Sequence, residues 1–279
     1  MNSKLIKTGL LSLLTVFFLF TSCSEDESPT ETDQETNLDF TLEESRQAAE
    51  SDEVTTGTLD IVEMAFVEVE ENDNRLRSLF SDCVTVIVSS ENGIKFVTLD
   101  FGLGCELNNG NIVSGMIHLT YGIPQNGTRT INYSFENFTF NSKGITGGGT
   151  IFRERSNASG NPQSTFHKNI EITFPDGIIA TIDGTRVREW IEGTGSGTWE
   201  DNVFSVTGNW ATDFSDGHSR SAIVTDPLRR EVICPFFVSG LVEVTRNETT
   251  GVLDFGDGTC DNLAILTVNG EEIEIILRH

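Results

Sequence analysis

Short stretches in which apolar and polar side chains alternate dominate the chain from residue 83 to its end. In the stretch 164–174 the residues on one face are Phe166, Ile170, Ile172 and Phe174. Such alternation is typical of strands with one buried face. Turn sequences separate the runs, with QNG at 125, PDG at 175, TGSG at 194 and SDG at 215. The pattern predicts an all-β antiparallel meander of roughly a dozen strands, as a large curved sheet, a sandwich or an open barrel.

A helical period is found only near the start of the predicted domain. Leu59, Val62, Phe66 and Val69 recur three or four residues apart, and the preceding residues LEESRQAAESDE are rich in helix formers. We therefore expect one or two short helices between about residues 42 and 78. Their apolar stripe is expected to pack on the sheet, with binding of a partner protein as the alternative.

A recurrent triplet, a β-branched residue followed by any residue and glycine, runs through the middle of the chain. Its glycines are Gly115, Gly147, Gly184, Gly208 and Gly240. The gaps between them are too uneven for a solenoid repeat. The triplets instead predict kinks, or a stripe of small residues, along a meander.

Two segments near the ends of the predicted sheet begin and end with cysteine. Residues 83–105 and 234–260 each contain an apolar run, a polar turn and a second apolar run, which predicts a β-hairpin. Facing residues in an antiparallel hairpin lie at distances that suit a disulfide. We therefore expect the pairs Cys83–Cys105 and Cys234–Cys260, each stabilising the fold by about 3 kcal/mol. A further strand follows each closing cysteine.

The first residues of the chain have the organisation of an export signal. Lys4 and Lys7 precede an apolar run from Gly9 to Phe20, which is too short to span a bilayer. The following residues, LFTSC, resemble a bacterial lipobox, although Phe20 replaces the usual leucine. The resemblance implies cleavage after residue 22 and lipidation of Cys23; an ordinary signal peptide is the alternative.

The segment from Cys23 to residue 40 is polar and acidic and shows no structural period, as expected of a disordered tether. Its SEDE sequence resembles the export signal of Bacteroidetes surface lipoproteins. The layout as a whole resembles uncharacterised lipoproteins of this group. The resemblance implies an outer-membrane location facing the cell exterior, a lipid anchor as the membrane contact, and a single β-rich domain over residues 41–279 with its helical part at about 42–78.

The net charge of −25 informs the prediction of binding partners more than the prediction of the fold. A field of this sign repels phosphate backbones, so we expect no binding to nucleic acid. Cations, neutral glycans and proteins are the partners that remain, and solubility alone is the simplest reason for the charge.

Residues 253–260, LDFGDGTC, are partly repeated at 99–105. Asp254, Asp257 and Asp261 supply the oxygen ligands that calcium prefers, which makes calcium a candidate cofactor, but their spacing is not that of an EF-hand. DFGDGT also resembles the signature of PKD modules, whose downstream motif is absent here. A glycine turn that closes the hairpin is the favoured interpretation, and no other cofactor is expected.

Four arginines on neighbouring predicted strands are the remaining candidates for binding: Arg153, Arg155, Arg186 and Arg188. They could line a groove for a carboxylated ligand, or form cross-strand pairs with acids such as Glu154 and Glu189. His118, His167, His218 and His279 have no metal-binding spacing, and no nucleophile motif accompanies them. The sequence therefore supplies no catalytic residues.

These features favour a surface lipoprotein that binds a ligand or partner, or serves as envelope scaffold, without catalysis. An extracellular enzyme acting on glycans or peptides is one alternative, and it would need a cleft with two facing carboxylates. A lipid carrier is the other, and it would need an apolar groove lined by Phe135, Phe138 and Phe166.

Overall fold

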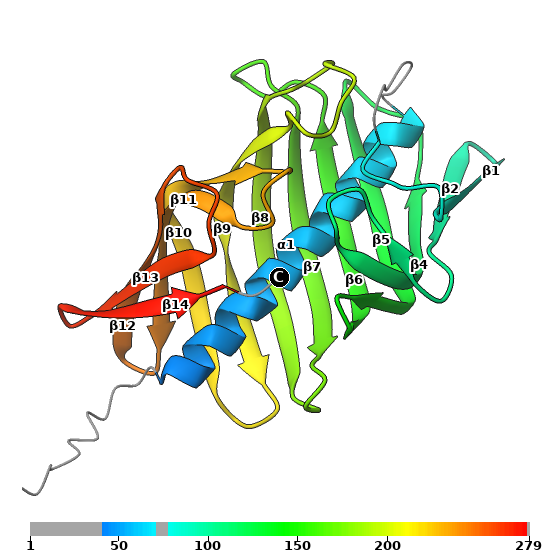
Figure 1. Ribbon diagram of the computed structural model, residues 1–279. Helices are drawn as coiled ribbons and strands as arrows, with labels where there is room; N and C mark the ends of the chain where they lie inside the picture. The colour runs from blue at the N-terminus through cyan, green and yellow to red at the C-terminus, as the bar shows by residue number, and fades with distance from the viewer. Residues whose placement is uncertain (1–40, 71–77, 278–279) are drawn as a thin grey trace, which may run out of the picture. The chain divides into compact units, whose positions relative to one another are not determined.

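Fourteen strands and one helix make up the part of the chain that the computed structural model describes, residues 41–70 and 78–277 (Figure 1). The elements are α1 (Leu42–Glu70), β1 (Thr85–Glu91), β2 (Ile94–Asp100), β3 (Cys105–Glu106), β4 (Ile112–Tyr121), β5 (Thr128–Phe140), β6 (Lys143–Glu154), β7 (Gln163–Thr173), β8 (Ile179–Glu192), β9 (Val203–Phe214), β10 (Ser219–Glu231), β11 (Phe237–Arg246), β12 (Thr249–Asp257), β13 (Leu263–Val268) and β14 (Glu271–Ile276).

The strands form one antiparallel sheet in which each strand pairs with its neighbours in sequence, except that β2 pairs with β4 and the short β3 pairs only with β4. The expected antiparallel meander is thus confirmed, and it takes the form of a single curved sheet that is not closed. Turns with left-handed asparagine followed by glycine join several hairpins, including Asn92–Gly93 between β1 and β2. The segment 263–276 carries the same turn at Asn269–Gly270 and forms two strands.

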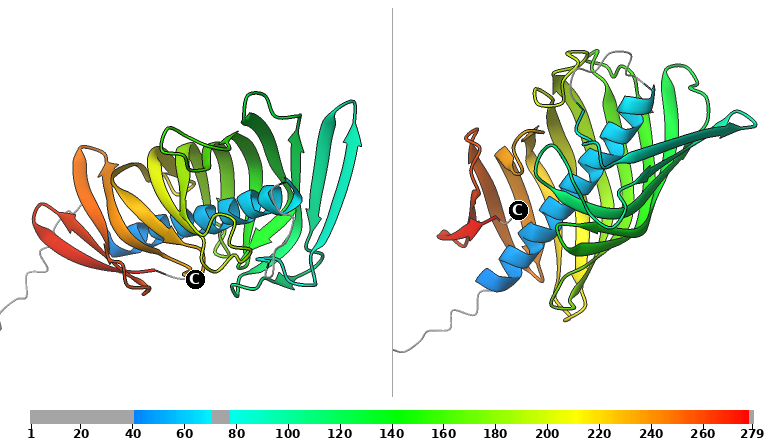
Figure 2. Two further views of the ribbon diagram at one scale, coloured as in Figure 1. Left: turned by 90° about the horizontal axis from the view of Figure 1, so that it is seen from above. Right: turned by 45° about the vertical axis from the view of Figure 1, so that its right-hand side comes forward.

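The helix α1 lies across the hollow face of the curved sheet, as Figure 2 shows. Thr41 caps its N-terminus: the Thr41 hydroxyl accepts a hydrogen bond from the Glu44 amide and donates one to the Glu44 carboxylate. Leu59, Val62 and Phe66 of the predicted stripe are buried, which confirms that this stripe packs on the sheet.

The burial of α1 is more extensive than that of a normal amphipathic helix. Every residue from Val54 to Val67 is buried, including the polar side chains of Thr55, Asp60 and Glu63. Instead of the one or two short helices expected between 42 and 78, the structure has one helix of 29 residues. Because the sheet curves around it, this helix has no solvent-exposed face over its central turns.

All five triplet glycines, for which the sequence predicts kinks or a stripe of small residues, have a positive φ. A β-carbon on Gly184 would lie 2.4 Å from the carbonyl oxygen of Asn209, and one on Gly208 would lie 2.2 Å from that of Thr185. Only glycine permits both this backbone conformation and this close approach of strands. These residues therefore allow β8 and β9 to bend around α1.

Both expected disulfides are present. Cys83 and Cys105 have Cα atoms 5.7 Å apart, and Cys234 and Cys260 have theirs 5.9 Å apart. The first connects the base of the β1–β2 hairpin to β3, and the second encloses the β11–β12 hairpin. The two disulfides therefore stabilise opposite ends of the strand order.

The two edge strands differ in polarity. All seven residues of β1 are exposed, including Val86, Ile87 and Val88. The other edge strand, β14, carries Glu271, Glu272 and Glu274, which discourage pairing with another chain. Among the described residues, no helix is long and apolar enough to cross a membrane.

Candidate functional site

The basic residues of the sheet point mainly at the helix. Between residues 78 and 277 the sequence has twelve lysines and arginines, and eight of them form ion pairs with carboxylates on α1. The pairs are Lys95 and Arg129 with Glu70, Lys143 with Glu50, Arg153 with Glu63, Arg188 with Asp60 and Glu63, Arg220 with Asp52, Arg230 with Asp60, and Arg246 with Glu44. We refer to these eight bases and six acids as the charge seam.

The centre of the charge seam is fully buried. Glu63 accepts hydrogen bonds from Arg153 Nη1 at 3.0 Å and from the Ser164 hydroxyl at 2.7 Å. Asp60 accepts two from Arg230, at 3.0 Å and 2.7 Å. Arg188 lies within ion-pair distance of both acids, 2.5 Å from Asp60 and 3.3 Å from Glu63. These contacts compensate charges that would otherwise be prohibitively costly to bury.

The strand register explains why these arginines meet. Arg129 faces Arg153, Arg153 faces Ser164, and Ser164 faces Arg188, so the four form one row across β5 to β8. Like charges opposite one another destabilise a sheet unless acids lie between them. The helix supplies those acids at Glu63 and Glu70.

Three of the four candidate arginines, Arg153, Arg186 and Arg188, therefore lie on the hollow face and are buried. The ion pairs of Arg153 and Arg188 described above are with carboxylates on α1. Glu154 accepts a hydrogen bond from Gln163, and Glu189 accepts one from Asn161. Arg155 is exposed and lines a separate cavity of about 110 Å³ beside Phe66 and Glu70 at the other end of α1.

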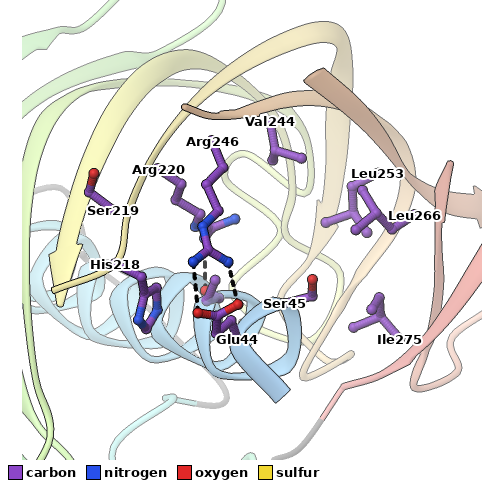
Figure 3. Close-up of a pocket in the computed structure, with 11 residues that line it drawn as sticks. Glu44, Ser45, His218, Ser219, Arg220, Val244, Arg246, Leu253, Leu266 and Ile275 are labelled. Atoms are coloured by element: carbon purple, nitrogen blue, oxygen red, sulfur yellow. Dashed lines mark hydrogen bonds and ion pairs between the residues drawn. The ribbon is translucent and has the colours of Figure 1, made fainter. Parts of the chain in front are cut away.

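An amphipathic pocket lies between the first turns of α1 and strands β10 to β14 (Figure 3). Four aliphatic side chains form one wall: Val244, Leu253, Leu266 and Ile275. Polar side chains line the rest of the pocket: Glu44, His218, Ser219, Arg220 and Arg246, with Ser45 between Glu44 and Ile275 in the view of Figure 3. The cavity volume is about 30 Å³, room for a small group rather than for a large ligand.

The charges in the amphipathic pocket are already paired. Arg246 donates two hydrogen bonds to Glu44, one of them 2.8 Å long, and these bonds lower the pKa of the Glu44 carboxyl to about 2. Arg220 pairs with Asp52. Three polar atoms of the lining residues have no hydrogen-bond partner among the described residues: the hydroxyl of Ser45, Nε2 of His218 and Nε of Arg220. The Ser45 hydroxyl or His218 Nε2 could bind the polar end of a ligand.

The His218 ring is held firmly in the pocket wall. It stacks on Phe214 with ring centroids 4.0 Å apart, and its Nδ1 lies 2.5 Å from Asp216. The SDG turn at 215 was predicted from the sequence, but the approach of His218 to α1 was not, because it depends on how the sheet curves. His118 contacts Thr98 and Glu136, and His167 contacts Thr185, as expected of structural histidines; His279 lies outside the described residues.

Each candidate calcium ligand accepts hydrogen bonds within its own turn. Asp254 bonds the Gly256 amide, Asp257 bonds Thr259, and Asp261 bonds the Leu263 amide. Over residues 41–70 and 78–277, no three His, Cys, Asp or Glu side chains are grouped so that they could hold a metal ion. The geometry thus supports the interpretation of the repeated phrase as turns.

The three phenylalanines considered for a lipid groove pack in the core. Phe135 stacks on Phe138 with ring centroids 5.4 Å apart, and Tyr133 contacts both Phe135 and Phe166. Cys23, the candidate lipidation site, lies outside the described residues. No family model, no curated protein and no solved structure matches the chain. Its function must therefore be argued from the sequence and the geometry alone.

Proposed function

We propose that the protein is a non-catalytic, lipid-anchored binding protein of the outer-membrane surface, and that the amphipathic pocket is its ligand site. The lipobox-like residues before Cys23 and the acidic segment after it support the anchor. The observation that carries the binding role is the amphipathic pocket, because the centre of the hollow face is already occupied by α1 and its carboxylates. The pocket at the start of α1 combines an apolar wall with unpaired polar atoms, as ligand sites commonly do.

The pocket's chemistry favours a small neutral amphiphile. An aliphatic chain end would lie against Leu253, Leu266 and Ile275, where it would be removed from water. A hydroxyl or amide head could bond either the Ser45 hydroxyl or His218 Nε2. A charged head is disfavoured because Arg246 and Arg220 are already neutralised by Glu44 and Asp52.

The alternatives from the sequence have less support. Asp60 and Glu63 are neighbouring buried acids, but both are paired with arginines, so neither resembles a glycosidase acid or nucleophile. A large lipid would need a cavity beside Phe135, Phe138 and Phe166, whose rings instead take part in a packed cluster of aromatic side chains. Calcium at Asp254, Asp257 and Asp261 remains a hypothesis for which the turns offer no geometric support.

The ligand site can be tested with 1-hexanol as the probe and hexanoate as the charged comparison. We expect hexanol to shift the amide resonances of residues around Ser45 and His218, with a weaker effect of hexanoate. Ser45→Leu should abolish the shifts by filling the pocket, whereas Glu43→Leu, exposed on the same turn, should leave them unchanged. Equal shifts in wild type and Ser45→Leu would refute the pocket as the site.

The anchor is tested separately by metabolic labelling with palmitate. The mature protein should carry the label and be digested by protease added to whole cells, and Cys23→Ser should remove the label. An unlabelled wild-type protein, or one protected from external protease, would contradict the proposed anchor or its orientation.

A further inference from the structure

Two cations in the middle of the hollow face lie outside the charge seam. Lys168 on β7 and Arg186 on β8 are 2% and 1% exposed, and both lie over the ring of Trp210 on β9. The Lys168 nitrogen is 5.0 Å and the Arg186 guanidinium carbon 4.6 Å from the centre of that ring. Two buried positive charges therefore share one aromatic partner.

Neither cation has a carboxylate partner in the described part of the chain. Arg186 donates from Nη1 to the Thr56 hydroxyl at 2.6 Å, but its Nε and Nη2 have no acceptor. The Lys168 nitrogen has none either. The acid that acts most strongly on Arg186, Asp52, gives one oxygen to Arg220.

Other hydrogen-bond donors on the same face also have no acceptor among the described residues. The indole N–H of Trp210 and the hydroxyl of Tyr133 are buried without a hydrogen-bond partner among the described residues. Tyr133 and Lys168 belong to one cross-strand row, because each faces Gly149, and Gly184 continues that row to Trp210. One buried acceptor near these donors, Asp52 Oδ1, is also without a hydrogen-bond partner, so unpartnered donors outnumber this single carboxylate oxygen.

The electrostatic imbalance cannot be relieved by Arg186 itself. A guanidinium remains protonated in proteins, so its charge must be compensated where it is buried. Burial lowers the pKa of Lys168 well below its usual value, with the Arg186 charge acting in the same direction. Deprotonation of Lys168 would reduce the repulsion but would leave Arg186 without an ion pair among the described residues, although the charges of Asp52 and Asp60 act on it favourably.

We propose that Lys168 and Arg186 bind a small monovalent inorganic anion, of the size of chloride, between β7, β8 and the overlying α1. An anion there would accept hydrogen bonds from the ammonium and from the free guanidinium N–H groups, and Trp210 or Tyr133 could complete its coordination. The site adjoins the buried helix, because Arg186 bonds the Thr56 hydroxyl and the charge of Asp52 acts on both cations. The inference is independent of the amphipathic pocket and of any lipid anchor.

The test uses the intact mature protein in chloride and in gluconate, an anion too large for the site, at equal ionic strength. Chloride should raise the unfolding temperature saturably, by about 5 °C at saturation, because it binds the folded state only. Lys168→Met should remove this response. Arg229→Met is the matched control, because Arg229 lies outside the hollow face and pairs with Glu192 and Glu231, and it should keep the response.

A crystal soaked in bromide provides a second readout that needs no variant. Anomalous scattering should place bromide within about 3.5 Å of the Lys168 nitrogen and of the Arg186 guanidinium. Equal unfolding temperatures in the two salts, an unchanged chloride response in Lys168→Met, or a bromide map without a peak there would each overturn the proposal. An Asp52 carboxylate bonded to Arg186 in that crystal would overturn it as well.

Discussion

Single carboxylates on α1 decide whether the arginines of the sheet can be buried. Glu63 alone contacts Arg153, Ser164 and Arg188, all from different strands. The pairs are largely screened from water, so salt weakens them less than it weakens surface pairs. The residue therefore connects the helix to three strands at once.

Replacement of Glu63 by glutamine should be strongly destabilising. The amide keeps the shape but leaves Arg153 and Arg188 with less negative charge, so we expect a loss of about 3 kcal/mol in the free energy of unfolding. Urea denaturation measures this loss. Glu43→Gln breaks only an exposed pair with Arg46 and should change the value by less than about 0.5 kcal/mol. Equal effects of the two variants would contradict the role of Glu63.

The Glu53 carboxylate, unlike that of Glu63, is expected to destabilise the folded protein when it is charged. Burial raises the pKa of its carboxyl well above the ordinary 4.5, and the nearby Glu50 and Asp52 act in the same direction. The folded state thus holds the proton more tightly than the unfolded state. Its contribution to stability is complete below about pH 4.5 and is lost as the pH rises through the folded pKa.

Glu53→Gln should therefore raise the free energy of unfolding at pH 7 and leave it nearly unchanged at pH 4. Denaturation at the two pH values measures the difference. Glu50→Gln is the control, because Glu50 pairs with Lys143 at 2.8 Å and its loss should not stabilise the protein at pH 7. A Glu53→Gln protein less stable than wild type at pH 7 would show that the carboxylate is compensated.

At the residue scale, the sequence predicted the disulfides but not the partners of the arginines. Cysteines at both ends of a hairpin are close by local geometry, so Cys83–Cys105 and Cys234–Cys260 follow from short-range pattern. The partners of Arg153 and Arg188 lie about a hundred residues away, on a helix whose polar residues normally face water. A possible signal was the spacing of Asp60 and Glu63 within a stretch that is otherwise apolar.

The bent strands are the elements on which the enclosure of α1 depends. Gly208 has φ of +135°, and an added β-carbon would meet backbone atoms of β8. The sequence predicted kinks at such positions because glycine is rare within strands. The sequence did not predict the direction in which the strands bend at these glycines. That direction depends on how α1 packs, and helix propensity alone predicted a shorter helix.

Gly208→Ala should cost about 2–4 kcal/mol of unfolding free energy, because it adds a backbone clash to an unfavourable φ. Gly177→Ala separates the two effects. Gly177 has φ of +92° in a turn with nothing within 4 Å of an added β-carbon, so only the conformational cost of about 1 kcal/mol should remain. Thermal unfolding of both variants measures the comparison, and equal losses would contradict a steric role for Gly208.

At the scale of the whole molecule, positive charge is concentrated inside and negative charge outside. Eight of the bases on the sheet pair with α1, while edge strand β14 and the turns carry exposed acids such as Glu271 and Asp176. The net charge of −25 therefore gives no indication that the hollow face of the sheet is basic and that the acidic helix covers it. Composition indicated an acidic surface, but only the three-dimensional structure shows where the arginines lie.

Native-state hydrogen exchange of α1 tests this arrangement most directly. Because residues 54–67 are enclosed by the sheet and paired with its arginines, their amides should exchange only through global unfolding. Their exchange free energies should then equal the free energy of unfolding measured with denaturant under the same conditions. Exchange of these amides at free energies several kcal/mol below that value, as in a helix that detaches while the sheet stays folded, would contradict it.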